Sequence, residues 1–169
     1  MEALVTAFMS GFWVFVGIVA GVVVQIGANL WMARRQKANA KDVLRCELEM
    51  NLAEIEKLRE RLGKLKQRVT SNQLEGTEFI DMLAFDYSAL QPLVQAGYFH
   101  KLLGSEGVKD YFTAMKFFNN ETAQFLTQRL WAEHDQNKSV VYIQWLEEQI
   151  KRHETEFKRT AARIDGKTP

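Results

Sequence analysis

Three histidines and a few carboxylates are the residues of this chain that could carry chemistry. His134 and Asp135 are adjacent, His100 precedes them and Asp165 follows them. Imidazole nitrogens and carboxylate oxygens bind catalytic metal ions, which activate water for hydrolysis. Asp135 falls beside a predicted turn and Asp165 in a predicted frayed tail. The pattern therefore favours an exposed helix terminus over a metal site.

The same order of residues resembles the metal-binding set of the HD phosphohydrolases, which are also all-helical. This resemblance implies a metal-dependent hydrolase that uses His134 and Asp135, and it is the weakest of three functional hypotheses. The sequence has no Glu-x-x-His pair for a di-iron site, and its one cysteine, Cys46, falls at an expected exposed position. We therefore predict no enzyme, with no catalytic residue, no metal and no cofactor.

Charge divides the chain into two parts. No charged residue occurs from Ala3 to Ala33, whereas the remainder is rich in charge. After Lys41, acidic residues slightly outnumber basic ones. A nucleic-acid partner is not expected, because nucleic-acid-binding domains usually carry a basic excess.

The uncharged stretch predicts a transmembrane helix over residues 1–33. As a helix, Ala3–Ala33 would be about 46 Å long, which exceeds the roughly 30 Å of a hydrocarbon core. A signal peptide is the alternative, but it would need a basic N-terminal region and a shorter apolar run. Two frames stay open: Trp13 and Trp31 as interfacial anchors, or Leu4–Val24 as the span.

Basic residues lie only at the C-terminal end of this stretch, where Arg34, Arg35 and Lys37 are followed by Lys41. Positive residues stay on the cytoplasmic side of a membrane. We therefore expect a single-pass protein of the cell (inner) membrane, with its N-terminus outside and its C-terminal domain cytoplasmic. The same basic residues are expected to contact anionic membrane lipid.

Four small or polar residues recur every fourth position and form one ridge of this helix: Gly17, Gly21, Gln25 and Asn29. The two glycines make a GxxxG motif, which lets a second helix approach closely. The two amides could hydrogen-bond across such a contact, because lipid offers them no partner. We expect the ridge to pack on protein, either in a homo-oligomer or in a larger membrane protein complex.

Residues 34–69 predict a basic flank and an amphipathic stalk helix. Apolar residues recur at spacings of three and four through Lys41–Val69, which is a coiled-coil-like heptad seam. Asn51 interrupts this seam, either to set register and partner number or as a hydrogen-bonded core residue. The stalk could pack on its own bundle or on another chain.

Residues 70–164 predict a helical bundle, and residues 165–169 a frayed tail. We expect a loop at 70–77, a short helix at 78–85, and short helices that end at Gly97 and Gly104. A long helix over 106–133, with Phe125 on its inner face, and a last helix over 140–164, capped by Ser139, should complete the bundle. The fold class is therefore all-α: one N-terminal transmembrane helix followed by a small cytoplasmic helical bundle.

Two further features of the bundle concern function. His153 lies in the apolar seam of the last helix, either as a hydrogen-bonded core residue or as a ligand or pH switch. Phe117 and Phe118 are adjacent and cannot both face one core. One of them, like Trp131 or Trp145, is therefore expected to form an exposed apolar patch for a partner.

The segment Glu47–Asn51 follows the basic flank, Gly97 closes a short helix, and Tyr111 precedes Asn119 and Asn120 on the next long helix. This pattern loosely resembles small bacterial proteins with one N-terminal span and a helical bundle. The resemblance implies a membrane-anchored helical domain and carries no activity with it.

The leading hypothesis is a membrane-anchored interaction protein, a scaffold or accessory subunit that assembles through its transmembrane helix and its helical domain. The alternative is an effector of the defence or toxin type that self-assembles in the membrane and perturbs it. Both follow from the polar ridge, the heptad seam and the missing catalytic motifs.

Overall fold

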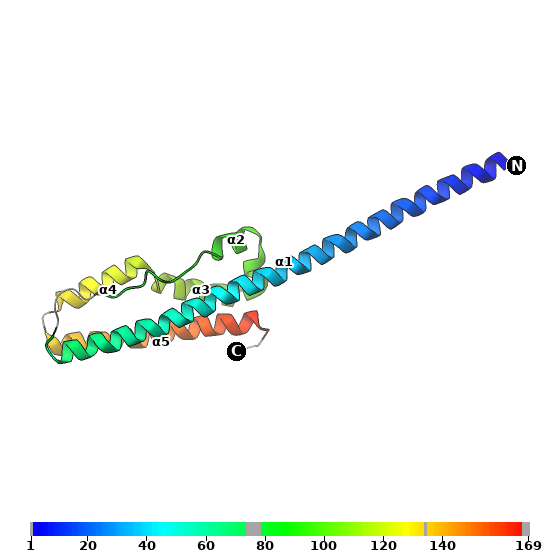
Figure 1. Ribbon diagram of the computed structural model, residues 1–169. Coiled ribbons are helices and arrows are strands. Elements are labelled where there is room, and N and C mark those ends of the chain that lie inside the picture. Colours follow the sequence, from blue (N-terminus) through cyan, green and yellow to red (C-terminus); the bar gives the residue numbers. More distant parts are fainter. Residues whose placement is uncertain (1, 74–78, 134, 167–169) are drawn as a thin grey trace. The chain divides into compact units, whose positions relative to one another are not determined.

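The computed structural model describes residues 2–73, 79–133 and 135–166, with side chains from residue 18 onward. Its helices are α1 (Glu2–Thr70), α2 (Leu90–Gln95), α3 (Tyr98–Phe117), α4 (Asn120–Ala132) and α5 (Gln136–Ile164) (Figure 1). The described residues contain no strand, which confirms the predicted all-α class. The chain divides into two compact units, Met1–Ala40 and Lys41–Pro169.

The first unit consists of the N-terminal part of α1. Every described side chain from Ile18 to Asn39 is exposed. Trp13 and Gly17 fall outside the described side chains, as does the first half of the predicted span over residues 1–33. Over the residues that are described, no helix combines the length and the apolar character needed to cross a bilayer.

In the second unit, α1 carries the predicted heptad seam, and the seam is buried within this chain. Leu44, Leu48 and Ile55 are fully enclosed, as are the later seam residues Leu58, Leu62 and Val69. Burying one such side chain contributes about 1.5–3 kcal/mol, so the seam is a main source of stability for this unit. The stalk therefore packs on its own bundle.

Helix α1 ends in a Schellman motif. Asn72 adopts φ 55°, the Asn72 N–H donates to the Val69 carbonyl at 3.1 Å, and the Gln73 N–H donates to the Arg68 carbonyl at 2.9 Å. Asparagine tolerates the left-handed region better than most residues, which explains its place here. The Gln136 amide also donates to the Val69 and Thr70 carbonyls, at 2.6 and 2.8 Å.

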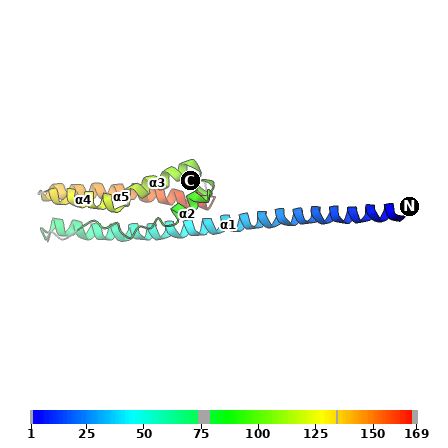
Figure 2. The same ribbon diagram turned by 90° about the horizontal axis from the view of Figure 1, so that it is seen from above.

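Helix α5 runs antiparallel to the second half of α1 (Figure 1, Figure 2). Ion pairs mark the register: Lys66 with Glu147 at 3.0 Å, Arg59 with Glu154 at 3.5 Å, and Arg45 with Asp165. The predicted seam of α5 is confirmed, since the following residues are buried: Ile143, Leu146, Ile150, His153, Phe157 and Ile164.

The start of α5 differs from the prediction of a Ser139 cap and a helix over 140–164. The helix begins at Gln136, and the Asp135 carboxylate accepts hydrogen bonds from the Asn137 and Lys138 N–H groups. Aspartate is a strong N-cap, so it starts the helix before Ser139 can do so. Ser139 is buried, and its hydroxyl donates to the Asp135 carbonyl at 3.1 Å.

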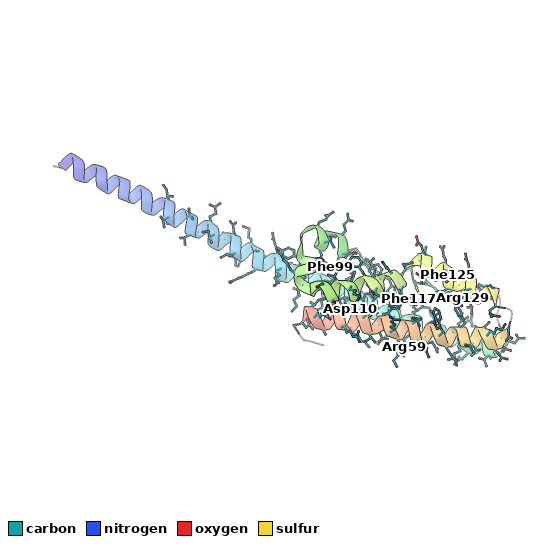
Figure 3. The ribbon with its side chains drawn as sticks, turned by 180° about the vertical axis from the view of Figure 1, so that it is seen from behind. Arg59, Phe99, Asp110, Phe117, Phe125 and Arg129 are labelled. Carbon is teal, nitrogen blue, oxygen red and sulfur yellow. The ribbon has the colours of Figure 1, made fainter. Side chains whose placement is uncertain are left out.

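The single helix predicted over 106–133 is wrong, because the chain breaks between α3 and α4. Phe118 leaves the helix with ψ 70°, and the Asn119 side chain accepts from the Thr122 N–H at 2.8 Å. The Asn119 cap competes with continued helix and starts α4 on a new axis. Figure 3 shows Phe99 and Phe117 on α3, and Phe125 on α4, where it is exposed rather than on an inner face.

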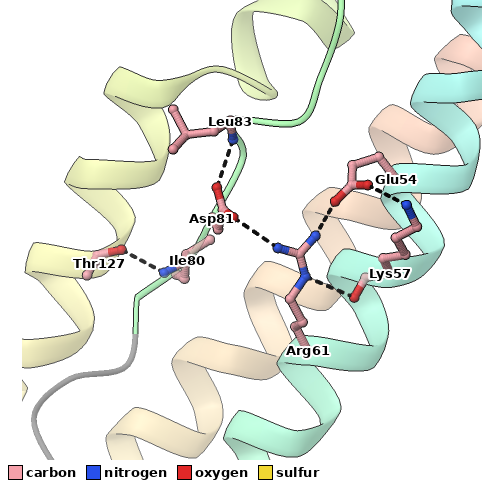
Figure 4. A network of polar contacts seen from close by, with 7 residues as sticks. All are labelled: Glu54, Lys57, Arg61, Ile80, Asp81, Leu83 and Thr127. Atoms are coloured by element: carbon pink, nitrogen blue, oxygen red, sulfur yellow. Dashed lines mark hydrogen bonds and ion pairs between the residues drawn. The ribbon is translucent and has the colours of Figure 1, made fainter.

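The short helix predicted over 78–85 is also wrong for the described residues 79–85, which form no helix. This segment lies between α1 and α4. The Ile80 N–H donates to the Thr127 hydroxyl at 2.9 Å, and Asp81 pairs with Arg61 at 3.2 Å (Figure 4). Ile80 and Met82 are buried while Phe79 and Leu83 are exposed, so alternate side chains face the core.

Candidate functional site

The structure does not bring the metal-ligand candidates together. Asp135 caps the start of α5 and Asp165 caps its end. At 1.5 Å per residue these two residues are separated by about 45 Å, too far to bind one ion. His100 is exposed, and His134 lies outside the described residues. Among the side chains that are described, no group of three or more His, Cys, Asp and Glu could hold a metal.

Asp165 was expected in a frayed tail, and that expectation is wrong for this residue. Its carboxylate pairs with Arg45 and lies 3.9 Å from the Lys41 ammonium. Residues 167–169 of the predicted tail lie outside the described part.

A buried polar cluster lies where α1, α3 and the segment before α2 meet. The Glu47 carboxylate accepts from the Tyr111 hydroxyl and from the Ala89 N–H, the latter at 2.7 Å. The Tyr87 hydroxyl donates to the Phe118 carbonyl at 2.8 Å. Glu47 and Tyr111 are enclosed, so this cluster holds the core together rather than meeting a ligand.

Burial governs the proton affinity of this cluster. Burial raises the pKa of the Glu47 carboxyl, against the opposing effect of the hydrogen bonds from Tyr111 and Ala89. Burial, the bond to Glu47 and its negative charge all raise the pKa of the Tyr111 hydroxyl well above its usual range. Burial and the charge of Glu47 raise the pKa of Tyr87 likewise. The cluster was not predicted from the sequence, where an acid directly beside the leucine seam was the available signal.

The two polar seam residues are both used inside the chain. Asn51 is fully buried and bonds to the backbone of Asp86. His153 is buried, its Nδ1 lies 2.7 Å from a Glu156 carboxylate oxygen, and its ring stacks on Phe117 at 4.3 Å between centroids. These contacts agree with the prediction of hydrogen-bonded core residues.

Phe117 and Phe118 both contribute to the core, contrary to the expectation for one of them. Phe118 is buried and stacks on Phe85 and Phe157, while Phe117 covers the His153 ring. This is possible because α3 ends at Phe117, so Phe118 leaves the helical path and turns inward. Trp145, by contrast, is exposed as expected.

The Trp145 surface, formed by Phe125 and Arg129 of α4 and by Val141, Tyr142 and Trp145 of α5, is the best candidate for a binding site. The Tyr142 and Trp145 rings stack at 5.6 Å, and the Arg129 guanidinium lies 5.3 Å from the Tyr142 ring centre. Val141 is 63% exposed, Phe125 59% and Trp145 41%. Figure 3 shows Phe125 and Arg129 side by side on α4.

A hollow of about 470 Å³ adjoins this surface, lined by Arg129, Glu133, Asn137, Lys138, Val141, Tyr142 and Trp145. Lys138 pairs with Glu133 at 3.7 Å, whereas Arg129 has no carboxylate partner among the described residues. Tryptophan, tyrosine and arginine are the residues most enriched at binding hot spots. The sequence offered Trp131 or Trp145 for such a patch but did not indicate Arg129 and Tyr142, which come together in the folded chain.

The described N-terminal candidates are all exposed. They are Gly21, Gln25, Asn29, Trp31, Arg34, Arg35 and Lys37. No described side chain lies within 4 Å of the position a Cβ would take at Gly21. The Arg35 guanidinium lies 5.4 Å from the Trp31 ring centre, so these two predicted anchors contact each other.

Comparisons with protein-family models, with curated proteins and with solved structures find no match to this chain.

Proposed function

We propose that the chain is a membrane-anchored interaction protein, a scaffold or accessory subunit whose helical domain binds another protein. The observation that carries this proposal is the stretch from Ala3 to Ala33, which has no charge and is followed at once by Arg34, Arg35 and Lys37. Such a stretch is long enough to cross a bilayer as a helix.

The described part of this stretch suits lipid. Apolar side chains are exposed around the helix rather than along one face; Ile18, Val23, Val24, Ile26 and Leu30 are each more than half exposed. In water, apolar surface of this extent is unfavourable, whereas acyl chains would cover it. Trp31 with Arg35 beside it is a pair typical of the membrane interface.

The basic flank supports one orientation. Arginine and lysine after the stretch favour a cytoplasmic C-terminal domain at the inner membrane, with the N-terminus outside. The helical domain would then meet its partner in the cytoplasm.

The Trp145 surface is the proposed contact with that partner. Its aromatic and aliphatic side chains match the apolar centre of an interface, and Arg129 offers a charge without a carboxylate partner among the described residues. We expect the partner to be a protein whose contact surface is apolar and carries at least one carboxylate opposite Arg129.

Membrane extraction tests the anchor. The full chain should remain with membranes after alkaline carbonate washing and be released by detergent. Val23→Glu combined with Val24→Glu should shift it to the soluble fraction, because each charge at mid-bilayer costs about 2.5–3.5 kcal/mol. Leu83→Glu combined with Val94→Glu, at exposed positions of the domain, is the matched control. A chain that stays in the supernatant without detergent would overturn the proposal.

Site-specific photo-crosslinking in native membranes tests the partner contact. A photoreactive phenylalanine analogue at Val141 or Phe125 should give one discrete adduct with another protein, and Arg129→Glu should abolish it. The same analogue at the exposed Thr155 of α5 is the control. If adducts at Val141 and at Thr155 are equally strong, or if neither forms, the Trp145 surface is not the binding site.

A further inference from the structure

The second half of α1 has an inner and an outer face. The inner seam of Leu44, Leu48, Asn51 and Ile55 is enclosed by the chain's own helices and is closed to other partners. The outer face carries exposed residues, and it is not uniformly polar as an ordinary solvent face would be.

Four residues of low polarity occupy the outer face in its first three turns. Val43 is 51% exposed, Met50 is 54% exposed, and Cys46 and Ala53 are also exposed. Their spacing of three, four and three residues is that of a coiled-coil seam. The next positions at the same spacing are Lys57, Glu60 and Lys64, so the apolar stripe stops at Ala53.

The same spacing, counted upstream along the sequence, meets only uncharged residues as far as Ile18. These are Asn39, Gln36, Met32, Asn29, Gln25, Val22 and Ile18. Eight charged residues fall between Ile18 and Ala53, and none of them occupies this register: Arg34, Arg35, Lys37, Lys41, Asp42, Arg45, Glu47 and Glu49. An uncharged register that passes straight through a basic flank is what a helix contact requires, because a buried unpaired charge is costly.

We propose that two copies of the chain associate in parallel along this register of α1, with the stripe of Val43, Cys46, Met50 and Ala53 as the contact in the helical domain. The inference rests on the proposed function, since it names the partner of the long helix. It leaves the Trp145 surface, on α4 and α5, available to a different protein.

The chemistry of the register selects a second copy over another occupant. Asparagine and glutamine side chains both donate and accept, so identical amides facing each other satisfy one another. In a parallel two-fold pair each residue meets its own counterpart, which places Gln25 on Gln25 and Asn29 on Asn29. An antiparallel pair over the same register would set Gln25 against Cys46 and Asn29 against Val43, and lipid would leave both amides without partners.

The charged flank of the stripe does not prevent this pairing. Glu49 lies beside the stripe and pairs with Arg45 of the same chain at 3.8 Å. The repulsion between two copies of Glu49 is reduced accordingly.

Cys46 makes the proposal directly testable, because it is the only cysteine of the chain. Full-length protein in native membranes is oxidised with copper phenanthroline and separated under non-reducing conditions. We expect a disulfide-linked dimer. The control is Cys46→Ser combined with Arg59→Cys, whose thiol is on another face of α1. The natural chain should crosslink at least about tenfold faster than this control, because paired thiols have an effective concentration near millimolar.

Two variants separate a specific register from chance collision. Cys46→Ser with Met50→Cys should crosslink as fast as the natural chain, and Met50→Glu should slow the Cys46 crosslink about tenfold by placing two carboxylates together. Lys57→Glu, beyond the end of the stripe, should leave it unchanged. Equal rates at positions 46 and 59, or adducts of Cys46 with another protein only, would overturn the proposal.

The two proposals fail in different ways. A chain that needs no detergent but still crosslinks at Cys46 refutes the membrane anchor and supports the parallel pair. A chain that resists carbonate extraction but is monomeric and does not crosslink refutes the pair and leaves the anchor standing.

Discussion

The Asn51 side chain forms two hydrogen bonds with the backbone of one residue, Asp86. Its amide donates to the Asp86 carbonyl at 2.7 Å, and its carbonyl accepts from the Asp86 N–H at 2.9 Å. The Asn51 side chain thus satisfies both backbone groups of Asp86, as the backbone of a neighbouring strand would do. Because Asn51 is fully buried, its own amide has no access to water in place of these bonds.

Asn51→Ala should lower the free energy of unfolding by about 2–4 kcal/mol, since it leaves the part-buried N–H and carbonyl of Asp86 without their partners. Urea unfolding of the full chain in mild detergent, followed by circular dichroism, measures this. Gln67→Ala, at an exposed position of α1 beyond the proposed contact stripe, is the control and should change the free energy of unfolding by less than about 0.5 kcal/mol. Equal effects of the two substitutions would show that the Asp86 contacts contribute nothing.

Much of this fold could be predicted from apolar periodicity. The seams of α1 and α5 repeat over many turns, and every turn that agrees with the helical period strengthens the prediction. The break at Phe118 could not be predicted in this way. Apolar residues continue through Phe118 at helical spacing, and the Asn119 cap decides the outcome locally.

The candidate sites depended on tertiary contacts that the sequence does not display. The sequence offered Trp131 or Trp145 as a member of an exposed apolar patch, and Trp145 is exposed in the folded chain. Arg129 of α4 lies over Tyr142 of α5, a contact between two helices that residue spacing does not reveal. Glu47 and Tyr111 are distant in sequence, and neither residue type alone indicates a buried pair.

Glu47 should make stability depend on pH. Its pKa is raised in the folded state by burial, so between the unfolded and folded pKa values the folded chain holds more protons. The contribution of Glu47 is therefore fully present below the unfolded pKa, near 4.5, and is lost as pH rises through the folded pKa. Between pH 4 and pH 8 the free energy of unfolding of the natural chain should therefore fall relative to that of Glu47→Gln. The two values should converge, or the variant should become the more stable of the two.

Glutamine keeps an acceptor for the Tyr111 hydroxyl and loses the second acceptor for Ala89, which adds an offset that does not vary with pH. Glu60→Gln, an exposed substitution on the same helix, should track the natural chain at every pH. A difference between the natural chain and Glu47→Gln that stays constant from pH 4 to pH 8 would contradict this assignment.

Two glycines offer a matched pair for backbone effects. Gly104 lies within α3 at φ 64° and ψ 177°, a region that only glycine adopts readily, whereas Gly63 is in the helical interior of α1 with open space around its Cα. Gly104→Ala should destabilise the chain by about 1–3 kcal/mol. Gly63→Ala should stabilise it by about 0.5–1 kcal/mol. Thermal unfolding of both variants checks the signs, and equal signs would contradict the kink at Gly104.

The basic flank should decide the orientation of the proposed span. In a Cys46→Ser background, a cysteine at the exposed Lys151 reports topology, because an impermeant maleimide reaches it only from the side where the domain lies. We expect no labelling in intact cells and full labelling after permeabilisation. Replacing Arg34, Arg35 and Lys37 by glutamine and Glu2 by lysine should invert part of the population and make it labelled in intact cells, because positive charge holds its end inside.

Removing three exposed bases elsewhere, at Lys109, Lys116 and Arg152, tests whether position or total charge matters. Position should matter, since the effect of positive residues on topology is confined to about 15–20 residues from the span. The control should stay unlabelled in intact cells. If the chain with the unaltered flank were labelled at position 151 in intact cells, the helical domain would lie outside the membrane. That result would overturn both the proposed orientation and the proposed cytoplasmic partner.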